Sequence, residues 1–171
     1  QNPLPQGNPI NGLWASSPSD VWAVGSRGTI LHYDGVAWKP SVSGSARNLY
    51  NIWGADATHV FAVGDSGVLL RWDGTAWQRE KSGTVETLLG VWGSSAKDVW
   101  VAGDAGTLLR YDGAGWSAER SGTTSQLASV WGTGPSDVWA VGAQGTARHY
   151  DGQLWGRSNT GINETLQAVF G

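Results

Sequence analysis

The sequence repeats itself every 39 residues along its whole length, without an insertion or a deletion. Five kinds of position recur at this spacing. They are Gly25, Gly64, Gly103 and Gly142; Gly28, Gly67, Gly106 and Gly145; Asp34, Asp73, Asp112 and Asp151, each followed by Gly; Trp38, Trp77, Trp116 and Trp155; and Trp14, Trp53, Trp92, Trp131 and, in a fifth copy, Phe170. Repeats of this length are typical of small units that bury their faces by stacking on their neighbours. The chain is therefore predicted to be a stack of copies of one unit.

Each unit is predicted to contain four short strands. In the first unit, the second strand covers 21–24 and the third covers 29–33, with a turn between Gly25 and Gly28. The pair Asp34-Gly35 indicates a hairpin, because glycine tolerates the positive φ that a tight turn requires. A fourth strand begins near Trp38, and a looser segment returns to the first strand of the next unit.

The second strand of each unit is apolar on both faces, as in Val21–Val24. An antiparallel sheet with one wet face would alternate apolar and polar residues. Strands buried on both sides, four to a unit of about 40 residues, are typical of the blades of a β-propeller. A β-solenoid is the alternative, but it makes less use of hairpin turns. The predicted fold is all-β, a β-propeller with four complete four-stranded blades and a surplus first strand.

The repeat boundaries are drawn at 10–48, 49–87, 88–126 and 127–165, with a partial unit at 166–171, within one domain that spans 1–171. The chain thus holds five first strands but only four second and third strands. Open ends would expose apolar faces that favour association. We expect a homo-oligomer or a part of a larger propeller ring; closure as a small monomer is the alternative.

Charge and composition exclude several classes of function. The net charge is −3 and no basic stripe is present, so nucleic-acid binding through phosphate neutralisation is not expected. No apolar run is long enough to span a membrane. The chain lacks cysteine, which excludes disulfides and thiolate sites. Low charge and abundant Trp and Gly predict a secreted or cell-surface protein, with the first ten residues interpreted as a mature or trimmed end.

Two segments carry a resemblance to a known family. Asp20–Trp38 reads DVWAVGSRGTILHYDGVAW and Asp98–Trp116 reads DVWVAGDAGTLLRYDGAGW. This pattern resembles the β-propeller repeats related to bacterial neuraminidase (Asp-box) repeats, in particular the branch found in photosystem-assembly propellers and bacterial surface proteins. One departure is that Gly directly follows Asp34, and Trp38 comes four residues after that Asp. The resemblance implies a fold but no single activity.

No residue pattern predicts catalysis, a metal site or a cofactor. The three histidines lack ligand spacing, and no nucleophile signature is present. His32 and His149 share a repeat position with Arg71 and Arg110, which predicts a solvated strand face. The repeated tryptophans are interpreted as packing between neighbouring blades, although indole rings could also stack on sugars.

Strand order predicts two rims with different character. The first-to-second and third-to-fourth turns share one rim and are nearly uniform between units, as folding alone requires. The second-to-third turns and the connections between units share the opposite rim, where the copies differ, and loops on a rigid scaffold commonly bind ligands. Unselected drift of these loops is the alternative explanation. The candidate ligand-binding residues are Arg27, Arg47, Asp65, Glu86, Asp104 and Gln144.

These observations predict a non-enzymatic scaffold that binds a protein or surface partner through its varied rim. A multivalent lectin with carbohydrate ligands is the first alternative, suggested by the Trp content. A glycosidase-like enzyme is suggested only by the resemblance to neuraminidase-type repeats. A recently amplified or engineered repeat without an evolved ligand is the last alternative.

Overall fold

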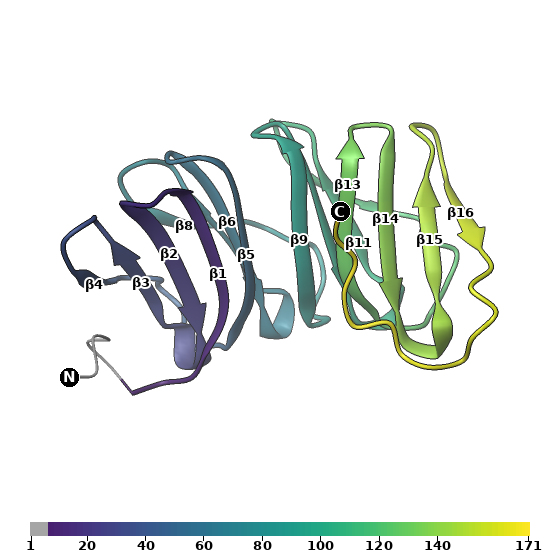
Figure 1. Cartoon of the computed structure of the whole chain (residues 1–171), viewed down its shortest axis with the longest axis horizontal. Helices are drawn as coiled ribbons and strands as arrows, with labels where there is room; N and C mark the ends of the chain where they lie inside the picture. The colour runs from purple at the N-terminus through teal and green to yellow at the C-terminus, as the bar shows by residue number, and fades with distance from the viewer. Residues whose placement is uncertain (1–6) are drawn as a thin grey trace.

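A computed structural model describes residues 7–171 and has four antiparallel sheets of four strands each (Figure 1). The fold is that of β-propeller blades, as the repeat predicts. The first strands of the four blades are β1 (Ile10–Ser17), β5 (Leu49–Asp56), β9 (Leu88–Ser95) and β13 (Leu127–Gly134). The second strands are β2 (Asp20–Gly25), β6 (His59–Gly64), β10 (Asp98–Gly103) and β14 (Asp137–Gly142). No helix among the described residues has the length and apolar character needed to cross a membrane.

Each blade is a simple meander in which consecutive strands pair. The third strands are β3 (Ile30–Tyr33), β7 (Leu69–Trp72), β11 (Leu108–Tyr111) and β15 (Ala147–Tyr150). The fourth strands are β4 (Trp38–Ser41), β8 (Trp77–Arg79), β12 (Trp116–Glu119) and β16 (Trp155–Ser158). A three-residue turn joins each second strand to the third: η1 (Ser26–Gly28), η2 (Asp65–Gly67), η3 (Asp104–Gly106) and η4 (Ala143–Gly145). The predicted four strands per unit are thus confirmed.

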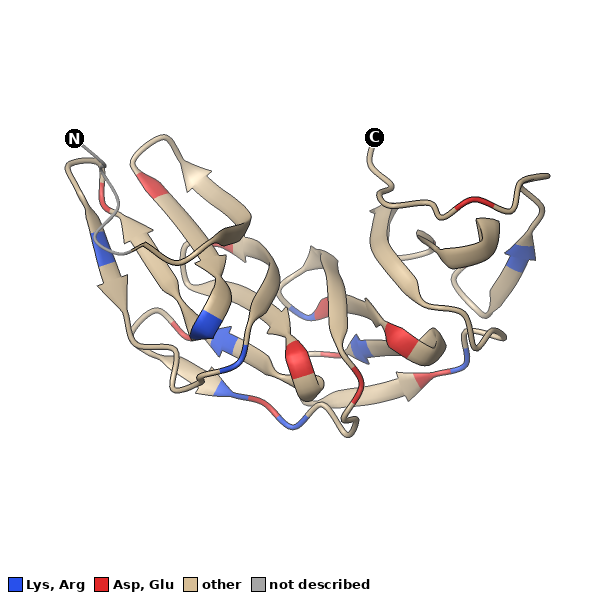
Figure 2. Ribbon diagram, turned by 90° about the horizontal axis from the view of Figure 1, so that it is seen from below, with Lys and Arg blue, Asp and Glu red and all other residues tan. Residues whose placement is uncertain are grey.

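The blades follow an arc, with the first strands packed side by side on its concave side (Figures 1 and 2). Contacts run from β1 to β5, from β5 to β9 and from β9 to β13. Within the described part of the chain, the blade of β1 and the blade of β13 lie at opposite ends of the arc and do not pack on each other. Blade 1 and blade 4 therefore each have one face without a neighbouring blade.

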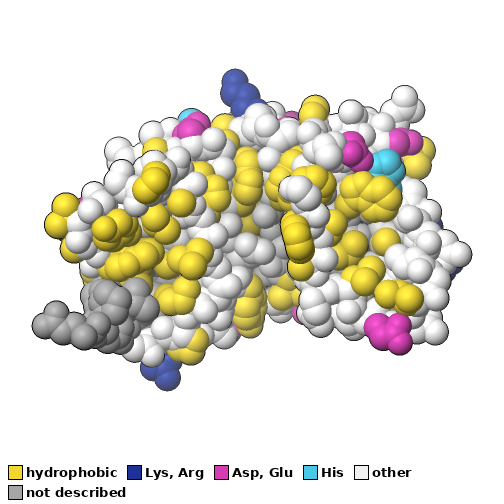
Figure 3. All heavy atoms as spheres, in the orientation of Figure 1, with side chains coloured by type: hydrophobic (Ala, Val, Ile, Leu, Met, Phe, Trp, Pro, Cys, Tyr) yellow, Lys and Arg dark blue, Asp and Glu magenta, His cyan; other side chains and the backbone are white. Residues whose placement is uncertain are grey.

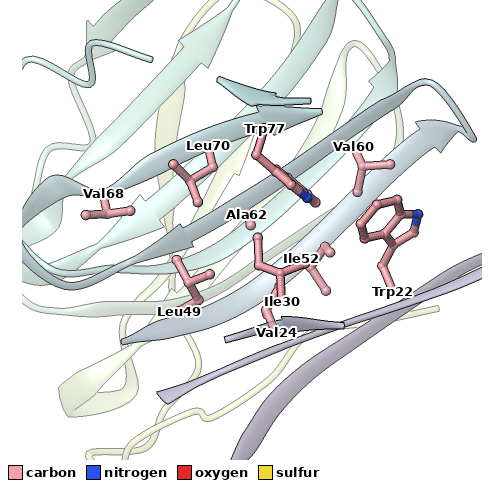
Figure 4. Packing of buried hydrophobic residues seen from close by; sticks show 10 residues of the cluster. All are labelled: Trp22, Val24, Ile30, Leu49, Ile52, Val60, Ala62, Val68, Leu70 and Trp77. Atoms are coloured by element: carbon pink, nitrogen blue, oxygen red, sulfur yellow. The ribbon is translucent and has the colours of Figure 1, made fainter. Parts of the chain in front are cut away.

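Three hydrophobic cores lie between successive blades. In the first core, Trp22 of β2 meets the edge of Trp77 of β8, with ring centroids 5.3 Å apart (Figure 4). The same edge-to-face contact joins Trp100 to Trp155 at 5.1 Å. Each buried aromatic side chain removes about 150–250 Å² from water. The recurrent Trp residues therefore hold neighbouring blades together, as their place in the repeat predicts.

A Trp–Gly contact sets the distance between successive first strands. A Cβ built on Gly54 would lie 2.6 Å from the Trp14 ring, and one on Gly93 would lie 2.6 Å from the Trp53 ring. Only a residue without a side chain lets the backbone approach an indole this closely. The contact recurs where Gly132 meets Trp92 and where Gly171 meets Trp131.

Residues 166–171 therefore take the place of a fifth first strand beside β13. The Val169 N–H donates to Ser129 Oγ at 3.3 Å, and Gly171 lies against Trp131. The segment does not join a sheet. This segment lies beside β13 as β5 lies beside β1. A further blade could therefore be added to the arc in the same geometry.

The outward face of blade 1 shows what a missing neighbour changes. Leu13 is 64% exposed, whereas its counterparts Ile52, Val91 and Val130 are only 4–5% exposed. Hydrophobic side chains extend over the side of the arc that carries the first strands (Figure 3). Exposed apolar surface of this kind favours association.

Candidate functional site

The two ends of the blades form two rims, which we call the turn rim and the linker rim. The turn rim holds the turns between first and second strands and between third and fourth strands, and a Cβ on Gly35 would touch Ser19 across it. The linker rim holds η1–η4 and the segments that connect successive blades. A Cβ on Gly28 of η1 would overlap the Ser45 carbonyl in the following linker, so these two kinds of loop are in contact.

The η turns have an unusual backbone that projects one side chain outward. Arg27, Ser66, Ala105 and Gln144 all have positive φ, between 52° and 57°, and the glycine that follows each of them is also at positive φ. The Thr29 N–H closes the first turn by donating to the Ser26 carbonyl at 3.1 Å. Two successive residues at positive φ make this a type I′ hairpin turn. A non-glycine residue at positive φ costs about 1–2 kcal/mol, and all four copies accept this cost.

Hydrogen bonds fix the linkers to these turns. The Gly67 N–H donates to the Glu86 carbonyl at 2.8 Å, and the Gly145 N–H donates to the Glu164 carbonyl at 2.7 Å. Within the linker, the Ser43 hydroxyl donates to the Ser45 carbonyl at 3.1 Å. The linker rim is therefore a firm backbone scaffold that carries different side chains in each blade.

All six predicted ligand-binding residues lie on the linker rim. Arg27 and Gln144 occupy equivalent positions in η1 and η4, at opposite ends of the arc, and both are exposed. Arg47 and Glu86 belong to linkers, where their N–H groups bond to Ser45 Oγ and Thr84 Oγ1. The structure thus spreads the six residues along the rim and does not gather them into one pocket.

The middle of the linker rim brings two predicted acidic residues near one tyrosine. Asp65 accepts a hydrogen bond from the Tyr50 hydroxyl of β5, and this bond, burial and the charges of Asp65 and Asp104 raise the pKa of Tyr50. Asp104 also accepts a hydrogen bond from Gln126 Nε2 at 2.7 Å. Among the predicted residues, the charge therefore changes from positive at Arg27 and Arg47 to negative at Asp65, Glu86 and Asp104, while other Lys and Arg residues also lie along the middle of the arc (Figure 2).

The turn rim is occupied by closed polar networks. Asp98 accepts hydrogen bonds from Ser94 Oγ at 2.6 Å and from Arg110 Nε at 2.9 Å, and the Arg110 guanidinium lies over the Trp100 ring. The Asp20 carboxylate binds His32 in the same way, and that imidazole stacks on Trp22 at 4.1 Å.

The sequence predicts a solvated strand face for four side chains, and the structure shows this face to be only partly solvated. The four are His32, Arg71, Arg110 and His149. These side chains are about one-third exposed, and each one is bound to a carboxylate. Blade 2 has His59 in place of the turn Asp, and its Arg71 binds Glu80 at 2.7 Å instead. The uniform turns thus have a structural role.

The polar networks do not have the arrangement of a Ser-His-Asp triad. In blade 1 the Asp20 carboxylate lies between the Ser16 hydroxyl and the His32 imidazole. A serine nucleophile needs the imidazole next to the hydroxyl, so that the imidazole can take its proton. Among residues 7–171, no group of three or more His, Asp or Glu side chains lies close enough together to hold a metal ion.

One site on the linker rim was not predicted from the sequence. Arg148 and Arg157 line a pocket of about 490 Å³ that also includes the predicted Gln144. The signal was present in the repeat, because Arg148 stands where Leu31, Leu70 and Leu109 stand in the other blades. A charged residue in a repeat position otherwise held by leucine marks a local departure from the shared fold.

Comparison with known proteins supports the propeller fold. Neither a known protein family nor a curated protein matches the sequence. Solved structures do match, among them YCF48 from Cyanidioschyzon merolae, with a TM-score of 0.70 and 20% identity over 92% of this chain. YCF48 bound to D1 peptide matches with a TM-score of 0.69 and 17% identity over 93% of this chain. The extracellular domain of a hybrid two-component system from B. thetaiotaomicron matches with a TM-score of 0.72 and 9% identity over 95% of this chain.

This chain is shorter than the propellers it resembles. It spans 59% and 57% of the two YCF48 chains and 26% of the two-component receptor chain. At these identities the likeness defines the class of fold, a β-propeller built from tandem blades. An activity does not follow from the fold.

Proposed function

We propose that this chain is a non-enzymatic propeller scaffold that binds a protein partner, as an extended peptide segment, along its linker rim. The observation that carries the proposal is the contrast between a uniform, hydrogen-bonded backbone and side chains that differ in every blade. That combination gives a rigid surface with a sequence of charges, which is what selective recognition requires. The structural similarity to YCF48 bound to D1 peptide supports a peptide as the kind of ligand.

The experiment selects peptides from a displayed random library on the intact chain and measures their affinity for variants. We expect selected peptides to lose at least tenfold in affinity for a variant with Arg27→Ala, Asp65→Ala and Asp104→Ala. The matched control carries Lys97→Ala and Gln153→Ala, two exposed residues on the turn rim, and should bind as the wild type does. Peptides that bind both variants equally well would contradict the proposal.

A carbohydrate ligand has weaker support. A lectin with one site per blade should repeat the polar groups of that site, and the linker rim does not repeat them. The recurrent Trp side chains pack between blades. The secreted or cell-surface location stays a prediction from composition.

We also propose that the end faces of blades 1 and 4 associate with a second copy of this chain. Leu13 is exposed on blade 1, and Trp139 on blade 4 lacks the aromatic partner from a next blade that Trp22 and Trp100 have. In such a pair, β1 of one copy would lie beside β13 of the other copy. Residues 166–171 already lie there, so they or β1 would have to move.

Sedimentation velocity over a range of concentrations tests this association. We expect the average mass to rise with concentration and the Leu13→Asp variant to stay monomeric. Leu13 is largely exposed within the single chain, so this substitution should leave folding intact. A wild-type chain that is monomeric at every concentration would rule out the association.

A further inference from the structure

Arg148 occupies a position that the other three blades reserve for a buried leucine. Leu31, Leu70 and Leu109 are only 1–2% exposed. In blade 4 the guanidinium of Arg148 reaches the linker between blades 3 and 4 and donates a hydrogen bond to the Gly122 carbonyl. Its Nε is buried and has no hydrogen-bond partner. A buried unsatisfied donor is costly and calls for an explanation.

A second arginine lies directly opposite Arg148. Arg157 of β16 is its cross-strand partner in the β15–β16 ladder, where blades 1 and 3 pair leucine with Pro40 and Ala118. Like charges directly opposite each other destabilise a sheet. Neither arginine takes part in an ion pair among the described residues. Burial, and then the charge of Arg157, lower the pKa of Arg148, as expected for a crowded pair of cations.

The pocket in front of these two arginines is lined by polar groups and lacks acidic side chains. Its lining includes the polar residues Ser125, Gln144, Asn159 and Thr160. Glu164 is outside the lining, and its carboxylate accepts a hydrogen bond from the Asn163 N–H at 3.2 Å. The positive charge of the pair is therefore not neutralised by any carboxylate that lines the pocket.

We propose that this pocket binds a tetrahedral oxyanion, that is, a phosphate or sulfate group. Each guanidinium offers five N–H donors, and a tetrahedral oxyanion accepts more hydrogen bonds than a carboxylate does. An anion here would pair the charges of Arg148 and Arg157, which no carboxylate pairs among the described residues. The volume of about 490 Å³ exceeds one such group, so it also accommodates part of the molecule that carries it. This site goes beyond the proposed function, because it needs no protein partner.

The first test titrates inorganic phosphate and then sulfate into the intact chain at low ionic strength, by isothermal calorimetry. We expect saturable binding that weakens at least tenfold in Arg148→Leu and several-fold in Arg157→Ala. Arg148→Leu restores the residue found in the other blades, so it should fold, with a higher unfolding temperature. The matched control is Arg79→Ala, because Arg79 holds the position of Arg157 in blade 2 but faces Leu70.

The second readout is thermal unfolding, which does not depend on the calorimetric signal. Phosphate should raise the unfolding temperature of the wild type more than chloride does at equal ionic strength, because a ligand that binds only the folded state stabilises it. The difference should vanish in Arg148→Leu. Equal phosphate affinity in the wild type and Arg148→Leu would overturn the site. Acetate that binds as tightly as phosphate would overturn the tetrahedral oxyanion as its ligand.

Discussion

The turn rim and the linker rim belong to the same blades, yet they differ in how their side chains are used. On the turn rim, side chains bind each other: Asp98 is buried among Ser94, Arg110 and Trp100. On the linker rim the backbone makes most of the fixed contacts, and side chains such as Arg27 and Arg47 extend into solvent. Folding therefore restricts the sequence on the turn rim and leaves the sequence of the linker rim free to serve a function.

Breaking a turn-rim network should destabilise the protein most. Asp98→Ala should reduce the free energy of unfolding by about 3 kcal/mol, because the half-buried Arg110 would lose its carboxylate. Urea unfolding followed by Trp fluorescence measures the change. Asp104→Ala is the control on the linker rim, where the carboxylate bonds to one exposed Gln126, and should cost less than about 1 kcal/mol. Equal losses would remove the contrast between the rims.

A second comparison separates backbone from side chain within one η turn. Gly106→Ala should cost about 2 kcal/mol or more, because a Cβ there would overlap the Thr123 carbonyl and φ is +69°. Its neighbour Ala105 also has positive φ but is exposed, so Ala105→Gly should raise stability by up to about 1 kcal/mol. Thermal unfolding of the two variants checks the signs. A gain from Gly106→Ala would contradict the turn geometry.

The turn rim should also weaken at low pH. N–H groups of Ala114 and Gly115 lower the pKa of Asp112 below its ordinary value of 3.8, and N–H groups of Leu154 and Gln153 do the same for Asp151. A lowered pKa in the folded state adds stability above about pH 4, and this stability is lost as the pH falls through the folded value.

The urea midpoint of Asp112→Asn, compared with the wild type from pH 6 to pH 2, tests this expectation. Asparagine keeps the acceptor oxygen but cannot titrate, so the wild type should lose its advantage as the pH falls. A constant difference across this range would show that the charge of Asp112 does not contribute.

The smallest expected effect is on the exposed part of the linker rim. Arg47→Ala should change the free energy of unfolding by less than about 0.5 kcal/mol, since its side chain is exposed and makes no ion pair within the described chain. Urea unfolding measures it beside Asp98→Ala. A loss of more than about 1 kcal/mol would mean that this rim is also needed for folding.

The fold was predictable because the same residue pattern occurs in all four units. The positions of Gly25, Asp34 and Trp38 recur without a shift in frame, so turns and packing residues could be assigned together. The pairing of Asp20 with His32 was not predictable, because it depends on a register in which side chains 12 residues apart meet across two strands.

The candidate site was predictable only in part. Strand order alone assigned the six predicted residues to one rim, where the structure has them. It could not show that Asp65 and Asp104 lie near one tyrosine, because that depends on the distance between blades. Arg148 was missed because single substitutions in a repeat have no meaning until the face they point to is known.

The tryptophan in each first strand contacts a glycine 40 residues later, so the contacts between blades all run in the same direction along the chain. Trp14 is covered by the unit that follows it, and so are Trp53 and Trp92. The tryptophan of each unit is thus covered by a glycine of the following unit, and not by one of the preceding unit. Duplicating one 39-residue module in frame would therefore create no new kind of junction, which offers a simple physical route by which such arrays lengthen.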